Sequence, residues 1–128
     1  MQKDSPTIMV VEDESLLLQA ITKKLDLHKI KTVSCTSGNQ ALDYLENFKQ
    51  MPDIIWLDYH LKDMDGLEFM NKLKMREKWK DIPIVVVSNS ATDEKVHNIL
   101  GLGAKKYIIK AEHRLDDIIK IVLELISD

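Results

Sequence analysis

Short apolar runs alternate along the chain with longer segments in which apolar residues recur every three or four positions. The strongest runs are Thr7–Val11, Ile54–Leu57 and Ile84–Val87. Their continuous apolar character predicts strands buried on both faces, as in a parallel sheet covered by helices. Two weaker runs, Lys31–Cys35 and Lys106–Ile109, carry polar residues and lysines. We therefore expect these two strands at the edges of the sheet.

The segments between the runs have the period of amphipathic helices. The apolar positions that define the predicted helical faces are Leu17, Ile21 and Leu25; Ala41, Leu42, Leu45 and Phe48; Leu67, Met70 and Leu73; Val96, Ile99 and Leu100; and Leu115, Ile118, Ile119, Val122 and Ile126. Helix start signals agree with this pattern, because Ser37-Gly-Asn-Gln40 and Asp65-Gly-Leu-Glu68 match capping boxes and Thr92 precedes the fourth face.

The repeated order of strand then helix predicts an α/β fold. Right-handed crossovers turn this order into a doubly wound parallel sheet, a three-layer (βα)5 sandwich. With the second and fifth strands at the edges, the spatial order of the strands is 2-1-3-4-5. A chain of 128 residues has the length of one domain. We expect residues 1–128 to form a single domain whose core covers about residues 7–126.

Composition argues against several classes of function. The formal net charge is −3, so the chain has no basic excess to neutralise nucleic-acid phosphates, and we expect no nucleic-acid binding. It contains no run of about 18 apolar residues, so we expect no membrane span. Cys35 is the single cysteine, which precludes an intrachain disulfide and fits a reducing, cytoplasmic location.

Chemically active side chains collect where the predicted strands end, which is where a doubly wound sheet binds ligands. These residues are Glu12, Asp13 and Glu14 after the first strand, Asp58 after the third, Ser88 after the fourth and Lys110 after the fifth. Crowded carboxylates raise one another's pKa unless a cation neutralises them. Mg²⁺ prefers carboxylate, carbonyl and water ligands. We therefore expect a Mg²⁺ site in which Asp58 is a nucleophile toward phosphorus and Lys110 balances charge.

Four motifs, taken in order, resemble the receiver domains of bacterial response regulators, the family of the chemotaxis regulator. The motifs are Val10-Val11-Glu12-Asp13-Glu14, Leu57-Asp58-Tyr59-His60-Leu61-Lys62-Asp63-Met64-Asp65-Gly66, Val86-Val87-Ser88 and Gly103-Ala104-Lys105-Lys106-Tyr107-Ile108-Ile109-Lys110. The likeness covers about residues 7–126. It implies a flavodoxin-like fold and a phosphoryl-accepting signalling switch that catalyses only its own phosphorylation and dephosphorylation.

The resemblance implies a role for each matching position. The roles are phosphoacceptor for Asp58, direct metal ligand for Asp13, metal partner often acting through water for Glu12, metal-binding backbone carbonyl for His60, switch hydroxyl for Ser88, inward-turning aromatic for Tyr107 and phosphate-pairing lysine for Lys110. The metal would be Mg²⁺, or Mn²⁺ in its place. His60 and Ser90 match positions that modulate the lifetime of the aspartyl phosphate, although an inert surface side chain remains the alternative for His60.

The resemblance also implies partners. The phosphoryl donor would be a phosphohistidine on a sensor histidine kinase or a phosphotransfer protein, docking on the helix expected at Ser15–Leu27. The output surface would be the fourth helix, fifth strand and fifth helix, at about residues 92–126. The sequence identifies neither the cognate kinase nor the downstream effector.

Three positions depart from the family pattern. Lys62 stands where proline is frequent, Asn89 where a small residue is common, and Ala111 where proline usually follows the lysine. The bulk of Asn89 would modulate phosphoryl access. A cis bond to alanine would cost about 3 kcal/mol, so we expect a trans bond after Lys110.

Three other functions are open to this topology. A flavodoxin-type redox protein needs a hydroxyl- and glycine-rich loop after the first strand, where this chain has Glu12-Asp13-Glu14. An aspartate-nucleophile phosphatase has a second acid two residues after the nucleophile, where this chain has His60. The third is a receiver-like interaction module that works without phosphorylation, which Lys62, Asn89 and Ala111 favour.

Overall fold

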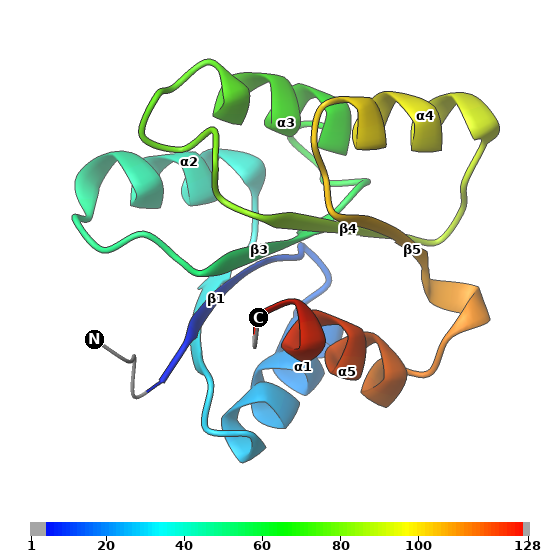
Figure 1. The fold of residues 1–128 in the computed structure, drawn as a ribbon. Coiled ribbons are helices and arrows are strands. Elements are labelled where there is room, and N and C mark those ends of the chain that lie inside the picture. The colour runs from blue at the N-terminus through cyan, green and yellow to red at the C-terminus, as the bar shows by residue number, and fades with distance from the viewer. Residues whose placement is uncertain (1–4, 127–128) are drawn as a thin grey trace.

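Five parallel strands form the centre of the computed structural model, which describes residues 5–126 (Figure 1). The strands are β1 (Thr7–Val11), β2 (Lys31–Cys35), β3 (Ile54–Asp58), β4 (Ile84–Ser88) and β5 (Lys106–Ile109). They lie in the order β2-β1-β3-β4-β5, and every pairing is parallel. The predicted doubly wound sheet and its strand order are confirmed. Residues 1–4 and 127–128 of the expected domain lie outside the described residues.

Two layers of helices cover the sheet. The helices are α1 (Ser15–Leu27), α2 (Gly38–Asn47), α3 (Gly66–Lys74), α4 (Asp93–Gly101) and α5 (Leu115–Ile126), with a short 3-10 helix, η1, at Lys110–Glu112. Helices α1 and α5 pack on one face, and α2, α3 and α4 pack on the other (Figure 1). Within the described residues, the structure contains no helix with the length and apolarity needed to cross a membrane.

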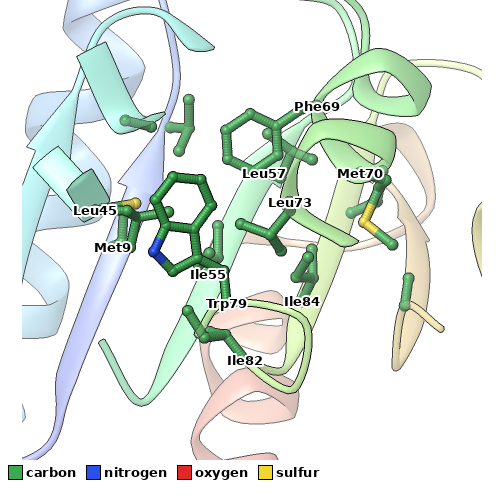
Figure 2. Packing of buried hydrophobic residues seen from close by; sticks show 14 of the residues in the cluster. Met9, Leu45, Ile55, Leu57, Phe69, Met70, Leu73, Trp79, Ile82 and Ile84 are labelled. Atoms are coloured by element: carbon green, nitrogen blue, oxygen red, sulfur yellow. The ribbon is translucent and has the colours of Figure 1, made fainter. Parts of the chain in front are cut away.

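Strands β1, β3 and β4 are buried along their whole length and supply two separate cores. Successive side chains of a strand point to opposite faces. Met9 and Leu57 therefore pack under α2, α3 and α4, whereas Val10 and Trp56 pack under α1 and α5. Figure 2 shows the first core, in which the Trp79 indole lies among side chains of the sheet and α3. The edge strand β2 is mostly half-buried or exposed, as its polar residues predict.

The predicted helix starts carry the expected caps. The side-chain oxygens of Ser37, Asp65 and Thr92 each accept a hydrogen bond from the backbone N–H three residues later. In the first box the Gln40 side chain reaches back to the N–H of Thr36, one residue before the cap, at 2.6 Å. The starts of α2, α3 and α4 are thus fixed by local sequence.

Three apolar positions differ from the predicted helical faces. Helix α2 ends at Asn47, so Phe48 lies in extended backbone, 55% exposed, and stacks on Tyr44 instead of entering the core. On α1 the buried residue is Leu18 rather than Leu17, which is half-buried. On α4 Leu100 is 43% exposed and the core contact is made by Ile99. On α1 and α4 a run of adjacent apolar residues left the buried position ambiguous by one, whereas Phe48 was misplaced because α2 ends before it.

The carboxylate of Asp63, in the loop between β3 and α3, contacts the start of α2. Asp63 accepts hydrogen bonds from the N–H groups of Gly38 and Asn39, at 3.0 and 2.8 Å. Burial raises the pKa of this carboxyl, but the two backbone donors outweigh burial and lower the pKa below its ordinary value. A negative charge here also interacts favourably with the N-terminal end of the helix dipole.

We expect Asp63→Ala to lower the free energy of unfolding by about 1 kcal/mol at pH 7, because two helix donors lose their acceptor. A group with a lowered pKa stabilises the fold above its unfolded pKa and loses that effect as pH falls through the folded pKa. The difference from wild type should therefore shrink when urea unfolding is measured below pH 3.8. Asp43→Ala, at an exposed position on α2, is the matched control. Equal stability of Asp63→Ala and wild type at pH 7 would contradict a stabilising role for the two hydrogen bonds that Asp63 accepts.

Candidate functional site

The register of the parallel strands brings two loops to the same point at the carboxyl edge of the sheet. Val11, the last residue of β1, pairs with Leu57, and Asp58 then closes β3. Glu12 and Asp13 follow β1 directly, so they emerge beside Asp58. The backbone N–H of Glu12 also donates to the carbonyl of Cys35 at 3.0 Å, which holds its position against β2.

Three carboxylates converge there. One carboxylate oxygen from each of Glu12, Asp13 and Asp58 lies within 4.8 Å of the others. Glu12 is 1% exposed and Asp58 is 5% exposed, so neither is free to relieve the repulsion in bulk water. Such a cluster needs positive charge to remain ionised.

Lys110 supplies part of that charge from the start of η1. Its Nζ lies 3.1 Å from Oε1 of Glu12 and 3.6 Å from Oδ1 of Asp58. The peptide bond between Lys110 and Ala111 is trans, as expected, and no cis bond occurs among the described residues. One ammonium group faces three carboxyl groups, so the described site has an excess of negative charge.

The two carboxylates that follow β1 are engaged differently. Glu12 uses both oxygens within the protein, because Oε2 accepts the N–H of Glu14 at 3.0 Å while Oε1 accepts from Lys110. Asp13 is half-buried, and its Oδ2 accepts the N–H of Lys62 at 2.8 Å. That donor exists only because residue 62 is not proline, which has no N–H.

Burial raises the pKa of Asp58 to about 7, and the nearby Glu12 charge pushes the pKa in the same direction. Lys110 and the N–H of His60, 3.4 Å from Oδ1, lower the pKa and offset part of this effect. Near neutral pH the metal-free carboxyl is therefore divided between its acid and carboxylate forms. Any cation placed among the acids would favour the carboxylate.

The donor set fits a hard divalent cation. Carboxylate oxygens from three separate acids lie close enough together to surround one ion, and the net charge of the cluster is unfavourable without one. Because both Glu12 oxygens are already engaged, Asp13 and Asp58 are the residues that would hold Mg²⁺ directly. Glu12 would then act at longer range.

Ser88 and Tyr107 meet through a third residue. Ser88 is fully buried at the end of β4, and its Oγ accepts the N–H of Ser90 at 3.4 Å. Tyr107, half-buried on β5, donates its hydroxyl to the carbonyl of Ser90 at 2.8 Å. The hydroxyl and the aromatic ring are thus connected by the backbone of a single loop residue.

The other expected site residues lie at the surface of the rim. Asn89 and Ser90 are exposed in the β4–α4 loop. The His60 side chain is exposed and packs edge-on against Tyr59, with ring centroids 4.9 Å apart. The backbone of His60 pairs with Asp65 in an isolated bridge, which shapes the loop after Asp58.

Sequence reasoning missed two further contacts around the site. The Lys95 ammonium of α4 lies 4.9 Å from the centre of the Tyr59 ring. The ring centroids of Tyr59 and Tyr107 are 6.3 Å apart. This group connects the loop after Asp58 with α4 and β5. Lysine at the first turn of a helix gave no signal for it, because such lysines are usually solvated.

Comparison with known proteins identifies the family. The model described as "Response regulator receiver domain" matches residues 8–123. A two-component response regulator of Oryza sativa subsp. indica is 30% identical over 106 residues, covering 83% of this chain and 87% of that protein. The phosphorylated cyanobacterial phytochrome response regulator RcpA aligns with a TM-score of 0.81 at 27% identity, covering 94% and 91% of the two chains. The receiver domain of the Francisella response regulator 1452 aligns with a TM-score of 0.84 at 23% identity, covering 96% and 98%. The chain therefore belongs to the response regulator receiver domain family of two-component signalling.

Proposed function

We propose that this receiver domain is a switch that accepts a phosphoryl group on Asp58. The observation that carries the proposal is the buried carboxylate of Asp58, placed among Glu12 and Asp13 with the Lys110 ammonium 3.6 Å away. A carboxylate in this setting is a nucleophile beside a fixed cation, the arrangement that phosphoryl transfer requires.

The transfer exchanges one bond to phosphorus for another. An Asp58 oxygen forms a P–O bond while the P–N bond to the imidazole of a donor phosphohistidine breaks, and the donor leaves with a neutral or protonated imidazole. Lys110 can shift from Asp58 toward the new phosphoryl oxygens, because its Nζ already lies between Glu12 and Asp58. The product is an acyl phosphate on this chain.

Mg²⁺ bound by Asp13 and Asp58 would supply the additional positive charge that three carboxylates and a phosphoryl group demand. Mn²⁺ has similar ligand preferences. The backbone carbonyl of His60 is the further ligand that we propose, because it belongs to the residue whose N–H already contacts Asp58. Glu12 holds Lys110 in place and tunes the charge of the site.

The response to phosphorylation would pass through Ser90. The phosphoryl group adds a charge of about −1.5 to −2 and new acceptor oxygens. The Ser88 hydroxyl can donate to one of them, and this movement would weaken its contact with the N–H of Ser90. The Tyr107 hydroxyl donates a hydrogen bond to the carbonyl of Ser90, so a shift of Ser90 would change where the Tyr107 ring packs. The surface of α4, β5 and α5 would then carry the output.

The partners follow from this role. We propose a sensor histidine kinase or a phosphotransfer protein as donor, docking near α1, and an effector that reads the α4–β5–α5 surface. The exchange would take place in the cytoplasm, which the single buried cysteine, Cys35, fits. The His60 side chain and Asn89 are exposed beside the site and would modulate the lifetime of the phosphoryl group.

One observation favours a second function, a receiver-like interaction module that needs no phosphorylation. The N–H of Lys62 already occupies an oxygen of Asp13, and Lys110 already neutralises part of the cluster. The site therefore has internal partners that a metal would have to displace or share. Phosphorylation itself distinguishes the two functions.

Incubation with acetyl phosphate and Mg²⁺ should add a single phosphoryl group to the wild-type chain, measured by intact mass. The adduct should be absent in Asp58→Asn, because the amide cannot form an acyl phosphate. It should persist in Asp43→Asn, which changes an exposed acid on α2 and keeps the same net charge as Asp58→Asn. An unmodified wild type, with Mg²⁺ shown to bind, would support the interaction module instead.

Mg²⁺ should bind about tenfold more tightly at pH 8 than at pH 6, because a proton on Asp58, whose pKa is about 7, competes with the metal. Isothermal titration calorimetry in two buffers with different ionisation enthalpies would report both the affinity and the protons released. In Asp58→Asn the residual affinity should depend little on pH over this range. A wild-type affinity that does not change with pH would contradict the raised pKa of Asp58.

Asp58→Asn should stabilise the metal-free protein at pH 8, by a difference on the order of 2 kcal/mol. A raised pKa means that Asp58 favours folding below the unfolded value of 3.8 and that this effect is lost as pH rises through about 7. The advantage of the amide should therefore shrink when unfolding in EDTA is repeated at pH 5. A variant less stable than wild type at pH 8 would show that the carboxylate is already compensated without metal.

A further inference from the structure

Helix α4 is held to the rest of the molecule by less buried surface than the other helices. Its one buried residue is Ile99, whereas α1, α2, α3 and α5 each bury three or four residues. Lys95 lies one turn before Ile99 and is half-buried, so it shares the face of α4 that points inward. The contacts of Lys95 therefore contribute to fixing the first turn of this helix.

The partner of Lys95 is the ring of Tyr59, the residue that follows Asp58. The ammonium lies 4.9 Å from the ring centroid, within the range of a cation–π interaction. The backbone of Tyr59 is fixed on two sides, because its N–H donates to the carbonyl of Val87 at 3.1 Å and its carbonyl accepts the N–H of Gly66 at 2.7 Å. A Cβ at residue 66 would lie 2.9 Å from the Tyr59 ring, so the ring packs directly on Gly66. The ring is therefore a fixed surface on which Lys95 rests.

The first turn of α4 is also joined to the residues that we propose as the switch. The N–H of Lys95 donates to the side-chain oxygen of Thr92, the N-cap of α4, at 3.1 Å. Two residues before this cap, Ser90 donates its N–H to Ser88 at 3.4 Å and accepts the Tyr107 hydroxyl at 2.8 Å. A movement of Ser90 would carry Thr92 with it and displace Lys95 from the ring beneath it.

We propose that Lys95 is a positioning residue of the switch, whose contact with Tyr59 holds the start of α4 in the arrangement that accompanies an unmodified Asp58. The inference rests on the proposed function, because it requires that a phosphoryl group on Asp58 displace Ser90. That displacement breaks the contact between Lys95 and Tyr59, so the contact opposes it. Such coupling is reciprocal, and any change that weakens the contact therefore favours the phosphorylated arrangement.

The contact can be followed in the whole wild-type chain by nuclear magnetic resonance. Protons held over the face of an aromatic ring resonate at lower frequency than the same protons in water. The ε-methylene protons of Lys95 should therefore be shifted upfield in the Mg²⁺-loaded protein. Beryllium fluoride, which forms a phosphoryl mimic on a carboxylate beside Mg²⁺, should move these signals toward the ordinary lysine position. The spectrum of Lys95→Arg assigns the signals, because they are missing from it.

Lys95→Met should tighten the binding of beryllium fluoride about threefold, because methionine keeps a long, unbranched side chain but lacks the charge that interacts with the Tyr59 ring. The affinity would be measured by isothermal titration calorimetry in saturating Mg²⁺. Loss of a positive charge by itself weakens the binding of an anion, so tighter binding has the opposite sign to a simple charge effect. Lys95→Arg, which keeps a cation for the ring, should bind beryllium fluoride as wild type does.

Lys120→Met is the matched control. Lys120 is exposed on α5, so the same substitution removes the same charge without changing the contact between α4 and Tyr59. Its affinity for beryllium fluoride should equal that of wild type or be slightly weaker. Cooperative urea unfolding of Lys95→Met and Lys120→Met establishes that both variants are folded before their affinities are compared.

Several results would overturn this inference and leave the proposed function intact. They are Lys95 methylene signals at the ordinary lysine position before beryllium fluoride is added, an upfield shift that persists after it is bound, and an affinity of Lys95→Met that is equal to or weaker than that of wild type. Equal tightening in Lys120→Met would assign the effect to net charge and would also overturn it. A wild type that binds Mg²⁺ but no beryllium fluoride would contradict the proposed function, and this inference with it.

Discussion

The ion pair between Lys110 and the buried acids is the interaction on which the rest of this rim depends. Glu12 is almost wholly buried, and a carboxylate in that position is tolerable only when a cation and other donors satisfy it. Lys110 Nζ at 3.1 Å and the N–H of Glu14 at 3.0 Å meet that condition. The same lysine lies 3.6 Å from Asp58, so the group that stabilises Glu12 also contributes to the charge around Asp58. Removing either partner would change the electrostatic environment of Asp58 as well as the contact that holds the start of η1 against the end of β1.

The loops around the site are held mainly by the polar groups of the site itself. Asp13 accepts the N–H of Lys62, the oxygen of Ser88 accepts the N–H of Ser90, and Asp58 contacts the N–H of His60. These bonds connect each strand end to the loop that follows or faces it. The phosphoryl group that we propose on Asp58 would therefore compete with the hydrogen bonds that define the loop conformations. Such competition would give a local chemical change a route to α4 and β5 without requiring any movement of the central strands β1, β3 and β4, which are buried along their whole length.

The fold could be predicted from the sequence because its three central strands are continuous apolar runs, a pattern typical of strands in a sheet covered on both faces. The membership of the site followed from the same prediction, because parallel strands bring Glu12, Asp13 and Asp58 to one edge. The predictions that were wrong or missing concern individual residues. Phe48 continues the apolar spacing of the predicted helix, and nothing in the local sequence showed that α2 would end at Asn47. Asp63 lies within a recognised motif, but its partners Gly38 and Asn39 are distant in the chain, so its role in capping α2 depended on the folded arrangement. The burial of the Trp56 indole N–H, which has no acceptor among the described residues, likewise depended on the folded arrangement.

Lys62 shows how a departure from the family pattern alters the site without changing any of its side chains. Proline is frequent at this position in the family, and proline cannot donate a backbone hydrogen bond. The lysine here restores the N–H, which binds Oδ2 of Asp13 at 2.8 Å. This backbone donor fixes the orientation of the Asp13 side chain, but it also occupies lone-pair space that a cation would use. The lysine side chain is exposed and adds positive charge near the rim. The hydrogen bond from Lys62 therefore orders the Asp13 side chain, and it gives the acidic cluster an internal donor in addition to the Lys110 ammonium.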